Sequence, residues 1–563
     1  MAIIIPSNMI TGLIGWVVFS IQSVQANELY SVYQEKQNTQ HLATSSAILD
    51  DQHQQQKEFL ENAEQQRKDL KKSLLLPEQA TDSFSTTDTH CVNIDEVTLL
   101  GAQSLPASVK DTLLQPIVHN CVTLIELKQL VRKVTNTYIS HGYITSQAQL
   151  PVQDLSTGKL HIVVIEGNIE AIEIDGKSSR MAKMLFPGMV GNPLNLRDIE
   201  QGLEQLNRLS TSLFTIDIQP GIKPGYSIVY IRQKAGYFPG KVRLGIENGG
   251  QKKTGEYQAN VGLVLDAPLS LGEQWSFSWT QDTDVRPAYH SRNLAFSINV
   301  PYGYWTTRYQ YFRNTSSQIL TAKFPYKSEN QTHQFDISRT LYRDGKQKVS
   351  LQAGGRHKTL ENAIGEQKLS VSSPVIKTSY ISPQYSTVLN RGYFTSNLIL
   401  EYGTAVTSSP VATRNRSRNF KLSSSYYYPI TTNIAYLTSI HGQLSMDNLF
   451  SSEQMSLGGF YSVRGYKKSL NGNQGLYWRQ EVTHQLDIGQ LGMLMLTGSV
   501  DYGHMVGQRR YGVDKAHLLG TAFGGTLIKQ ALSSRLMVGK PLYYPHTFKP
   551  DMWVFYAAVS LEF

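Results

Sequence analysis

The last twelve residues of the chain, 552–563, read MWVFYAAVSLEF and give the first indication of the fold. Apolar side chains occupy every second position of this stretch and are Trp553, Phe555, Ala557, Val559, Leu561 and Phe563. A period of two places these side chains on one face of a β-strand, opposite a mixed face. Two interpretations fit: the closing strand of an outer-membrane β-barrel, ending on the aromatic Phe563, or an ordinary strand at the edge of a sandwich.

The same alternation continues through residues 240–563. We count about 16 runs of this kind, a number within the range of bacterial outer-membrane barrels. The runs begin near Lys241, Glu256, Trp275, Arg292, Trp305, Thr332, Val349, Val375, Phe394, Asn419, Ile434, Leu476, Met493, Ala516, Ser534 and Trp553. Short connections, such as residues 302–304, alternate with long ones, such as residues 446–475. This pattern predicts a transmembrane barrel of about 16 antiparallel strands, wide enough for an aqueous lumen.

The composition is compatible with such a barrel. Only 17% of the residues are charged, Tyr occurs 31 times, and the mean hydropathy is −0.29. Beyond the N-terminus there is no run of about 18 apolar residues, so no transmembrane helix is expected. The net charge is +9, but Lys and Arg are scattered, so no nucleic-acid partner is expected.

The N-terminal region has the features of an exported protein. Residues 1–26 contain an apolar core and no charged side chain, and residues 24–26 form a small-residue cleavage site, so we expect a signal peptide. A polar extension follows over residues 27–47. The polar stretch 49–70 has no Gly or Pro and predicts a solvated helix within residues 48–72; a disordered tract is the alternative. Residues 73–89 are expected to form a linker.

The two cysteines, Cys91 and Cys121, form a close, even pair in an exported chain, which indicates a disulfide. Closing a loop of about 30 residues would contribute roughly 3–4 kcal/mol in the chain-entropy model. Two buried free thiols are the alternative. Two cysteines alone do not complete a zinc shell, so no metal site is expected.

Residues 90–167 and 168–236 carry the same order of predicted elements, strand-helix-helix-strand-strand. In the first unit, Thr123 and Glu126 have the spacing of a capping box, and Gly142 follows as a helix stop. In the second unit, residues 192–195 precede the longer helix. Two units of one element order form an internal repeat.

No pattern typical of catalysis occurs in the chain. It has neither a His-Glu-x-x-His motif nor a P-loop nor a Gly-x-Ser-x-Gly elbow, so no enzyme activity and no cofactor are expected. The long connection 446–475 is different, because its Gly- and aromatic-rich segment 458–466 favours folding inward. Arg464 lies in that segment, and Asp501 lies on the lumenal parity of its strand. These two side chains are natural partners; the alternative is two unrelated polar groups in water.

Specific motifs resemble a known superfamily. Val463-Arg464-Gly465-Tyr466 resembles the loop signature of the POTRA-bearing outer-membrane barrels, and Asp501-Tyr502-Gly503 resembles the strand motif that receives its Arg. Ser499 stands where the family usually has Phe. Residues 142–146 and 153–160, with the cysteine pair, resemble the first POTRA domain of two-partner secretion transporters, the ShlB/FhaC/HecB or TpsB family. Residues 192–200 and 205–209 resemble the second.

The resemblance covers residues 48–563 and implies a function. Such a protein secretes a large, unfolded β-helical exoprotein, of haemolysin, adhesin or contact-dependent toxin type, without ATP. The barrel would lie in the outer membrane and the POTRA domains in the periplasm, with helix 48–72 as a plug. The implied partners are the exoprotein, outer-membrane lipid and the barrel-assembly machinery for its own insertion.

The resemblance also assigns roles to single residues. Arg464 and Asp501 would lock the loop to the barrel, supported by Val463, Gly465, Tyr466 and Gly503. The residues implied in exoprotein recognition are Gln153, Asp154, Asn195 and Arg197. Two rival functions are an assembly insertase of the same superfamily, which usually carries more POTRA units and no plug, and a porin or receptor, which carries none.

Overall fold

The structure is a computed structural model that describes residues 46–71, 90–235, 239–250, 255–283, 290–319, 325–407, 414–506 and 515–563. The expected signal peptide, the extension up to residue 45 and the linker 73–89 lie outside the described residues.

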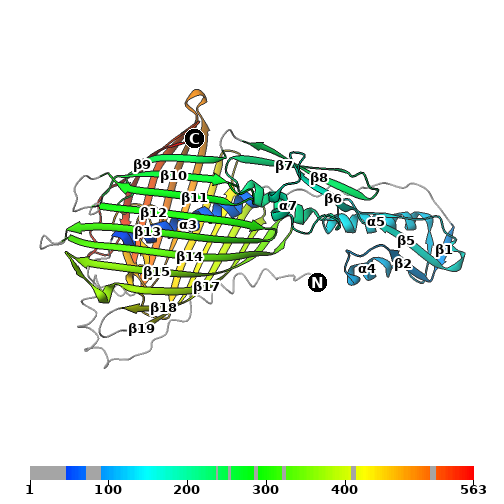
Figure 1. Cartoon of the computed structure of the whole chain (residues 1–563), viewed down its shortest axis with the longest axis horizontal. Coiled ribbons are helices and arrows are strands. Elements are labelled where there is room, and N and C mark those ends of the chain that lie inside the picture. The colour runs from blue at the N-terminus through cyan, green and yellow to red at the C-terminus, as the bar shows by residue number, and fades with distance from the viewer. Residues whose placement is uncertain are drawn as a thin grey trace. The chain divides into compact units, whose positions relative to one another are not determined.

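Sixteen strands of the described residues close into an antiparallel barrel (Figure 1). The strands are β9 Gly240–Glu247, β10 Gln258–Asp266, β11 Gln274–Asp282, β12 His290–Tyr302, β13 Trp305–Ile319, β14 Pro325–Arg343, β15 Gln347–Ile364, β17 Pro374–Leu389, β18 Gly392–Thr407, β19 Arg414–Pro429, β20 Ile434–Ser445, β23 Gln474–Asp487, β24 Met493–Val506, β25 Lys515–Lys529, β26 Leu532–Tyr543 and β27 Val554–Glu562. A two-residue strand, β16 (Gln367–Lys368), folds back onto β15. Strand β27 pairs with β9, with Val559 opposite Ile246, and this pairing closes the cylinder. The predicted barrel is confirmed.

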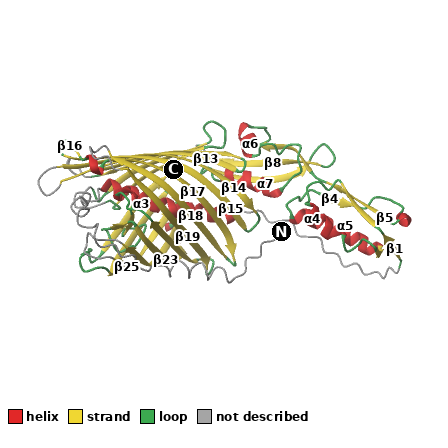
Figure 2. Ribbon diagram, turned by 90° about the horizontal axis from the view of Figure 1, so that it is seen from below, coloured by secondary structure: helices red, strands yellow, loops and turns green. Residues whose placement is uncertain are grey.

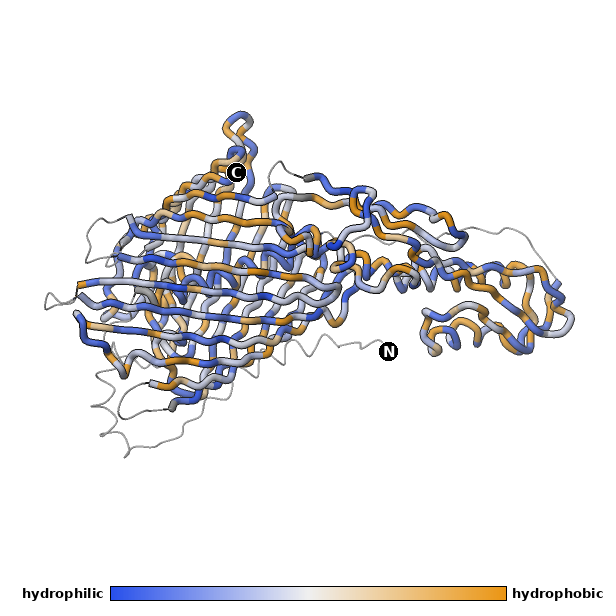
Figure 3. The backbone as a smooth tube through the Cα atoms, viewed as in Figure 1, coloured by the Kyte–Doolittle hydropathy of each residue, from blue (hydrophilic) through white to orange (hydrophobic). Residues whose placement is uncertain are grey.

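Hydrophobic and hydrophilic residues are interspersed along the barrel strands (Figure 3). Successive side chains of a strand point to opposite faces, so the barrel has a lipid face and a lumenal face. In β27, Phe555 is 62% exposed on the outside, whereas Tyr556 is 5% exposed on the inside. In β24, Val500 faces outward, and Asp501 is fully buried inside, as its parity predicts. Strand β9 follows the N-terminal units directly, so the short turns lie on their side of the barrel and the long loops on the opposite side.

The two N-terminal units share one topology (Figure 2). The first contains β1 Cys91–Ile94, β2 Glu96–Leu100, α4 Ala107–Leu114, β3 Asn120–Thr123, α5 Leu124–Ser140, β4 Gln147–Gln149, η1 Leu155–Thr157 and β5 Lys159–Ile165. The second contains β6 Asn168–Ile174, α6 Arg180–Leu185, α7 Leu196–Asn207, β7 Ser212–Pro220 and β8 Tyr226–Ala235. Their sheets run β2-β5-β4 and β6-β8-β7, and in each the first strand lies parallel to the last. The internal repeat is therefore structural.

Local signals in the sequence place the helices of these units. Thr123 caps α5 through a complete capping box with Glu126, and Gly142 adopts a φ of 94° just after this helix. Each unit has its own apolar core, built in the first around Leu127, Tyr138 and Ile162. The first strand expected in this unit is broken at Asp95 into β1 and β2, because β1 pairs with β3 in a separate two-stranded sheet.

The disulfide joins the two strands of that small sheet. Cys91 and Cys121 are bonded, with their Cα atoms 5.3 Å apart. Strands β1 and β3 are only four residues long, so the covalent link is a large part of what holds this sheet together.

Replacing both cysteines with alanine is expected to lower the free energy of unfolding of the first unit by roughly 3–4 kcal/mol, because the unfolded chain regains its loop entropy. Chemical denaturation of the purified protein measures this change. Mass spectrometry of unreduced peptides is the control for the bond. Alkylation of both thiols in unreduced protein taken from the periplasmic side would contradict the assignment.

Candidate functional site: the barrel lumen

Helix α3 (Ser46–Lys71) lies inside the barrel, among strands β12 to β19 (Figure 1). Its composition is polar on all sides, which suits a wet lumen. No described helix combines the length and the apolarity needed to cross a membrane. The expected helix 48–72 is thus present, and it begins two residues earlier than predicted.

The N-terminal half of α3 binds the backbone of the long loop between β20 and β23. The Gln52 side chain donates to the carbonyl oxygens of Ser451 and Gln454, at 3.0 and 2.7 Å. One turn further along, the Gln56 side chain donates to the carbonyl oxygen of Ser456 at 2.8 Å. The spacing of four residues places both glutamines on one face of the helix.

The C-terminal half of α3 contacts the barrel wall toward the side of the short turns. Phe59 packs on His441 with ring centroids 4.4 Å apart. The Arg67 guanidinium lies 4.3 Å from the ring centre of Tyr427, near the periplasmic end of β19. A cation over a tyrosine face gains about 0.5–1 kcal/mol when exposed. The helix therefore spans the lumen and is held by side-chain contacts to both the loop and the wall.

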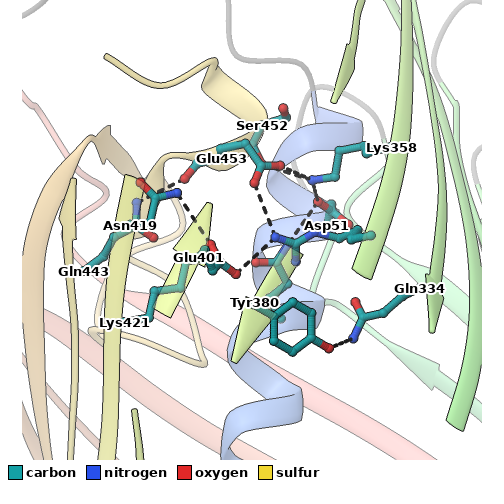
Figure 4. A network of polar contacts seen from close by, with 12 residues as sticks. Asp51, Gln334, Lys358, Tyr380, Glu401, Asn419, Lys421, Gln443, Ser452 and Glu453 are labelled. Carbon is teal, nitrogen blue, oxygen red and sulfur yellow. Dashed lines mark hydrogen bonds and ion pairs between the residues drawn. The ribbon is translucent and has the colours of Figure 1, made fainter. Parts of the chain in front are cut away.

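One buried cation joins the helix, the loop and the wall (Figure 4). The Lys358 ammonium of β15 lies 3.0 Å from Asp51 of α3 and 2.8 Å from Glu453 of the loop helix η3 (Ser451–Glu453). It also donates to the carbonyl oxygen of Ser452 at 3.2 Å. Lys358 is 1% exposed, so it requires these partners.

The neighbouring strands extend this cluster. Arg356 contacts Glu401 at 3.2 Å and Glu453 at 3.4 Å, and Lys421 contacts Glu401 at 2.9 Å. The cluster balances three cations, Arg356, Lys358 and Lys421, with three carboxylates, Asp51, Glu401 and Glu453. Only Asp51 belongs to α3. Without the helix, wall and loop keep three cations and two carboxylates, a net charge of +1.

The tip of the same loop is bound deep in the lumen by Arg464. Its guanidinium makes a two-pronged contact with Asp501 of β24, with Nε and Nη2 each 2.6 Å from a carboxylate oxygen. The backbone N–H of Arg464 donates to the same carboxylate at 3.0 Å. Both side chains are at most 1% exposed. The structure thus brings together the two residues that the sequence pairs, in the strongest ion-pair geometry proteins use.

A second carboxylate completes this contact. Glu481 of β23 lies 3.2 Å from Arg464 and 2.9 Å from Arg479. Arg479 in turn donates to the carbonyl oxygen of Tyr461 at 3.0 Å. Sequence reasoning did not identify Glu481 or Arg479, although both share a lumenal parity opposite the exposed Trp478 and Val482.

Glycines of the barrel wall form the surface on which the tip rests. A Cβ atom on Gly503 would approach Val463 to 2.8 Å, and one on Gly539 would approach Gly465 to 2.9 Å. A Cβ on Gly520 of β25 would collide with the carbonyl oxygen of Arg464. The wall thus presents no side chains from these glycines to residues 463–465, and the backbone of the tip packs directly on the backbone of the strands.

Tyr466 and Tyr556 fix the backbone of the tip. The Tyr466 hydroxyl lies 2.7 Å from the carbonyl oxygens of Leu519 and Tyr543. At this point a β-bulge interrupts the pairing register of β25 and β26. The Tyr556 hydroxyl accepts from the N–H of Gly465 at 3.1 Å. Gly465 has a φ of 96°, which disfavours any other residue. Ser499, at the position where the family usually has Phe, donates to the carbonyl oxygen of Ala522. The aromatic side chain that contacts the tip here is Tyr556 of β27.

The four candidate recognition residues lie in the N-terminal units, and each supports local structure. The Gln153 side chain exchanges two hydrogen bonds with the His161 backbone, each 2.8 Å long. Asp154 accepts from the N–H of Ser156, and this bond lowers the pKa of Asp154. Asn195 caps α7 and donates to the carbonyl oxygen of His141 in the first unit at 3.1 Å. Their role in recognition stays a prediction.

Arg197 and the rest of α7 face the periplasmic rim of the barrel. The Arg197 side chain pairs with Glu200 at 2.7 Å. Further along the helix, Glu204 contacts Arg343 and Lys348, residues beside the turn between β14 and β15. Although burial opposes ionisation of Glu204, these two cations lower its pKa below the ordinary value. The second unit is therefore joined to the barrel through a charged contact.

The closed barrel, the tandem N-terminal units and the plugged lumen together define a POTRA-bearing outer-membrane transporter. The family model for the haemolysin secretion/activation protein ShlB/FhaC/HecB matches residues 225–527. A ShlB-type POTRA domain matches residues 92–167, and a second POTRA model matches residues 168–220. The chain belongs to the ShlB/FhaC/HecB family of outer-membrane transporters of two-partner secretion, as the motifs indicated.

Comparison with individual relatives supports this family assignment. The outer membrane transporter CdiB of Dickeya dadantii (strain 3937) is 34% identical, over 91% of this chain and 93% of that protein. The hemolysin transporter protein ShlB of Serratia marcescens is 31% identical, over 75% of this chain and 77% of its own length. The solved structure of CdiB from Escherichia coli superposes with a TM-score of 0.87 at 31% identity, covering 93% of this chain and all of that one.

Proposed function

We propose that this chain receives one large exoprotein in the periplasm as an extended polypeptide and passes it through the barrel lumen to the cell surface. The observation that carries the proposal is α3, a polar helix that fills the lumen but is held there by side-chain contacts. Polar and charged contacts can be exchanged for water one at a time, so the helix can leave without disturbing the strand ladders.

The N-terminal units are the proposed receptor. Strand β7 is an edge of its sheet, with no strand paired on its outer side among the described residues. An extended exoprotein segment can add to such an edge through backbone hydrogen bonds. Gln153, Asp154, Asn195 and Arg197 would position the loops and the joint between the units rather than hold the exoprotein alone.

The cargo is proposed to be a β-helical haemolysin, adhesin or contact-dependent toxin. Relatives named as haemolysin transporters support an exoprotein of this type. The chain carries no nucleotide-binding motif, so folding of the exoprotein outside the cell would oppose its return. Outer-membrane lipid surrounds the barrel in this scheme, and the assembly machinery of the membrane inserts it.

The test is secretion of the exoprotein encoded beside this gene, in cells that lack other transporters of the family. With the full-length chain the exoprotein is expected at the cell surface or in the medium. A variant lacking residues 90–235, with heat-modifiable barrel as its control, is expected to leave it in the periplasm. Equal secretion by both proteins would contradict the receptor role. Loss of other outer-membrane proteins when the gene is deleted would instead indicate an insertase.

A further inference from the structure

A row of basic side chains crosses the lipid-facing surface of the barrel over strands β15 to β19. His357 lies opposite Lys377, Lys377 opposite Thr404, and Thr404 opposite Arg416 in the strand registers. We call His357, Lys377 and Arg416 the exterior basic row. All three are exposed, and the flanking residues Lys358 and Ile376 are buried in the lumen.

The row lies at the outer boundary of the apolar surface. Lys377 is about 12 residues from the periplasmic end of β17, which corresponds to about 30 Å along the membrane normal for a strand tilted by about 40°. The apolar band of such barrels is about 25 Å tall. Tyr402, which is 51% exposed, precedes Thr404 on the same face, toward the periplasm. The row therefore meets the headgroups of the outer leaflet.

The positive charge of the row is not compensated within the described protein. No described residue forms an ion pair or hydrogen bond with the side chains of His357, Lys377 or Arg416. Three carboxylates near this end of the strands already have cations, in the pairs Arg313–Glu329, Lys368–Glu361 and Arg418–Asp447. Cationic side chains this close repel each other unless an anion lies between them.

The spacing suits a phosphate group. Neighbouring strands are about 4.8 Å apart, so the Cα atoms of Lys377 and Arg416 lie about 10 Å from each other, with only Thr404 between them. Their long side chains can converge on one phosphate, and the His357 ring lies on the next strand. Beyond β15, His333 continues the row and is hydrogen bonded to Tyr309 at 2.8 Å.

We propose that the exterior basic row binds the phosphate of a phosphorylated glycolipid in the outer leaflet. The acyl chains of this lipid would then cover the exposed apolar side chains below the row. These include Phe335, Ile381, Leu398, Tyr402 and Leu422. The site is independent of the lumen and of the exoprotein.

Native mass spectrometry of the delipidated full-length protein tests the proposal, with bisphosphorylated lipid A as the probe. The wild type is expected to bind one molecule of the added lipid A. The double variant Lys377→Gln/Arg416→Gln is expected to bind it at least about tenfold more weakly, because two phosphate-directed cations are lost. The matched control, Lys346→Gln/Lys529→Gln, removes two exposed lysines from periplasmic turns and should bind as the wild type does.

Two further arms use the wild-type protein and do not depend on the folding of any variant. Dephosphorylated lipid A should bind far more weakly than the bisphosphorylated form, and millimolar inorganic phosphate should not displace the lipid. Equal binding of the two lipids, or of wild type and double variant, would overturn the proposal. Displacement by inorganic phosphate alone would show a general anion site and would also overturn it.

Discussion

Deleting residues 46–71 is expected to raise the single-channel conductance of the reconstituted barrel several-fold. With its side chains, an α-helix is about 10–12 Å wide, and α3 runs along the lumen from the loop side to the periplasmic end. Removing it replaces protein with water and ions. Planar-bilayer recording measures the effect, and unchanged conductance would contradict the role of α3 as a plug.

Point variants in α3 distinguish release of the helix from the lumen from its deletion from the chain. Asp51→Asn combined with Gln52→Ala and Gln56→Ala removes the contacts to Lys358 and to the loop backbone, while leaving the helix in the chain. We expect longer openings at the conductance of the deletion variant. Glu64→Gln is the matched control, because the Glu64 carboxylate pairs with Lys68 of the same helix at 2.8 Å.

The buried charges predict that the plug returns after each opening. When α3 leaves, Lys358 keeps Glu453 as a partner, so the loop stays attached to the wall. The cluster then carries one excess positive charge, which attracts Asp51 back. This arrangement gives a closed state that is favoured but reversible, as a secretion pore in the outer membrane requires.

The sequence predicted the barrel well because a half-buried strand has a strict two-residue period. The number of strands and most of their beginnings follow from that period alone. Strand β14 begins at Pro325 rather than near Thr332, and β19 at Arg414 rather than near Asn419. The missed residues extend beyond the lipid, where the outward side chains, such as Lys327 and Glu329, are polar and the alternation of hydropathy disappears.

The contacts inside the lumen were harder to predict. Arg464 and Asp501 were found because both lie in recognisable motifs. The cluster around Lys358 brings together Asp51 and Glu453, which lie about 400 residues apart in the sequence. No local sequence pattern predicts a contact between residues so far apart. Gly520 and Gly539 likewise look like ordinary strand glycines until the loop tip is placed against them. Periodicity assigns a side chain to the lumen but does not name its partner there.

Replacing Arg464 with alanine is expected to impair exoprotein secretion much more than barrel assembly. The substitution removes the Arg464 guanidinium from the fully buried Asp501 carboxylate, whereas Glu481 keeps Arg479 as a partner at 2.9 Å. Losing one partner of a buried pair costs about 3–5 kcal/mol. That cost is enough to free the loop tip from the glycine surface. It is small against sixteen paired strands, so heat-modifiable barrel should still reach the outer membrane.

A double-mutant cycle tests whether Arg464 and Asp501 act as one unit. Asp501→Ala should produce a defect no larger than that of Arg464→Ala, because Arg464 then keeps Glu481 at 3.2 Å. The double variant should be no worse than Arg464→Ala, since the shared interaction is already gone. Lys468→Ala, in an exposed position of the same loop, is the control and should secrete normally. The readout is secreted exoprotein divided by folded barrel; if the two single defects add in the double variant, the two residues do not act as partners in secretion.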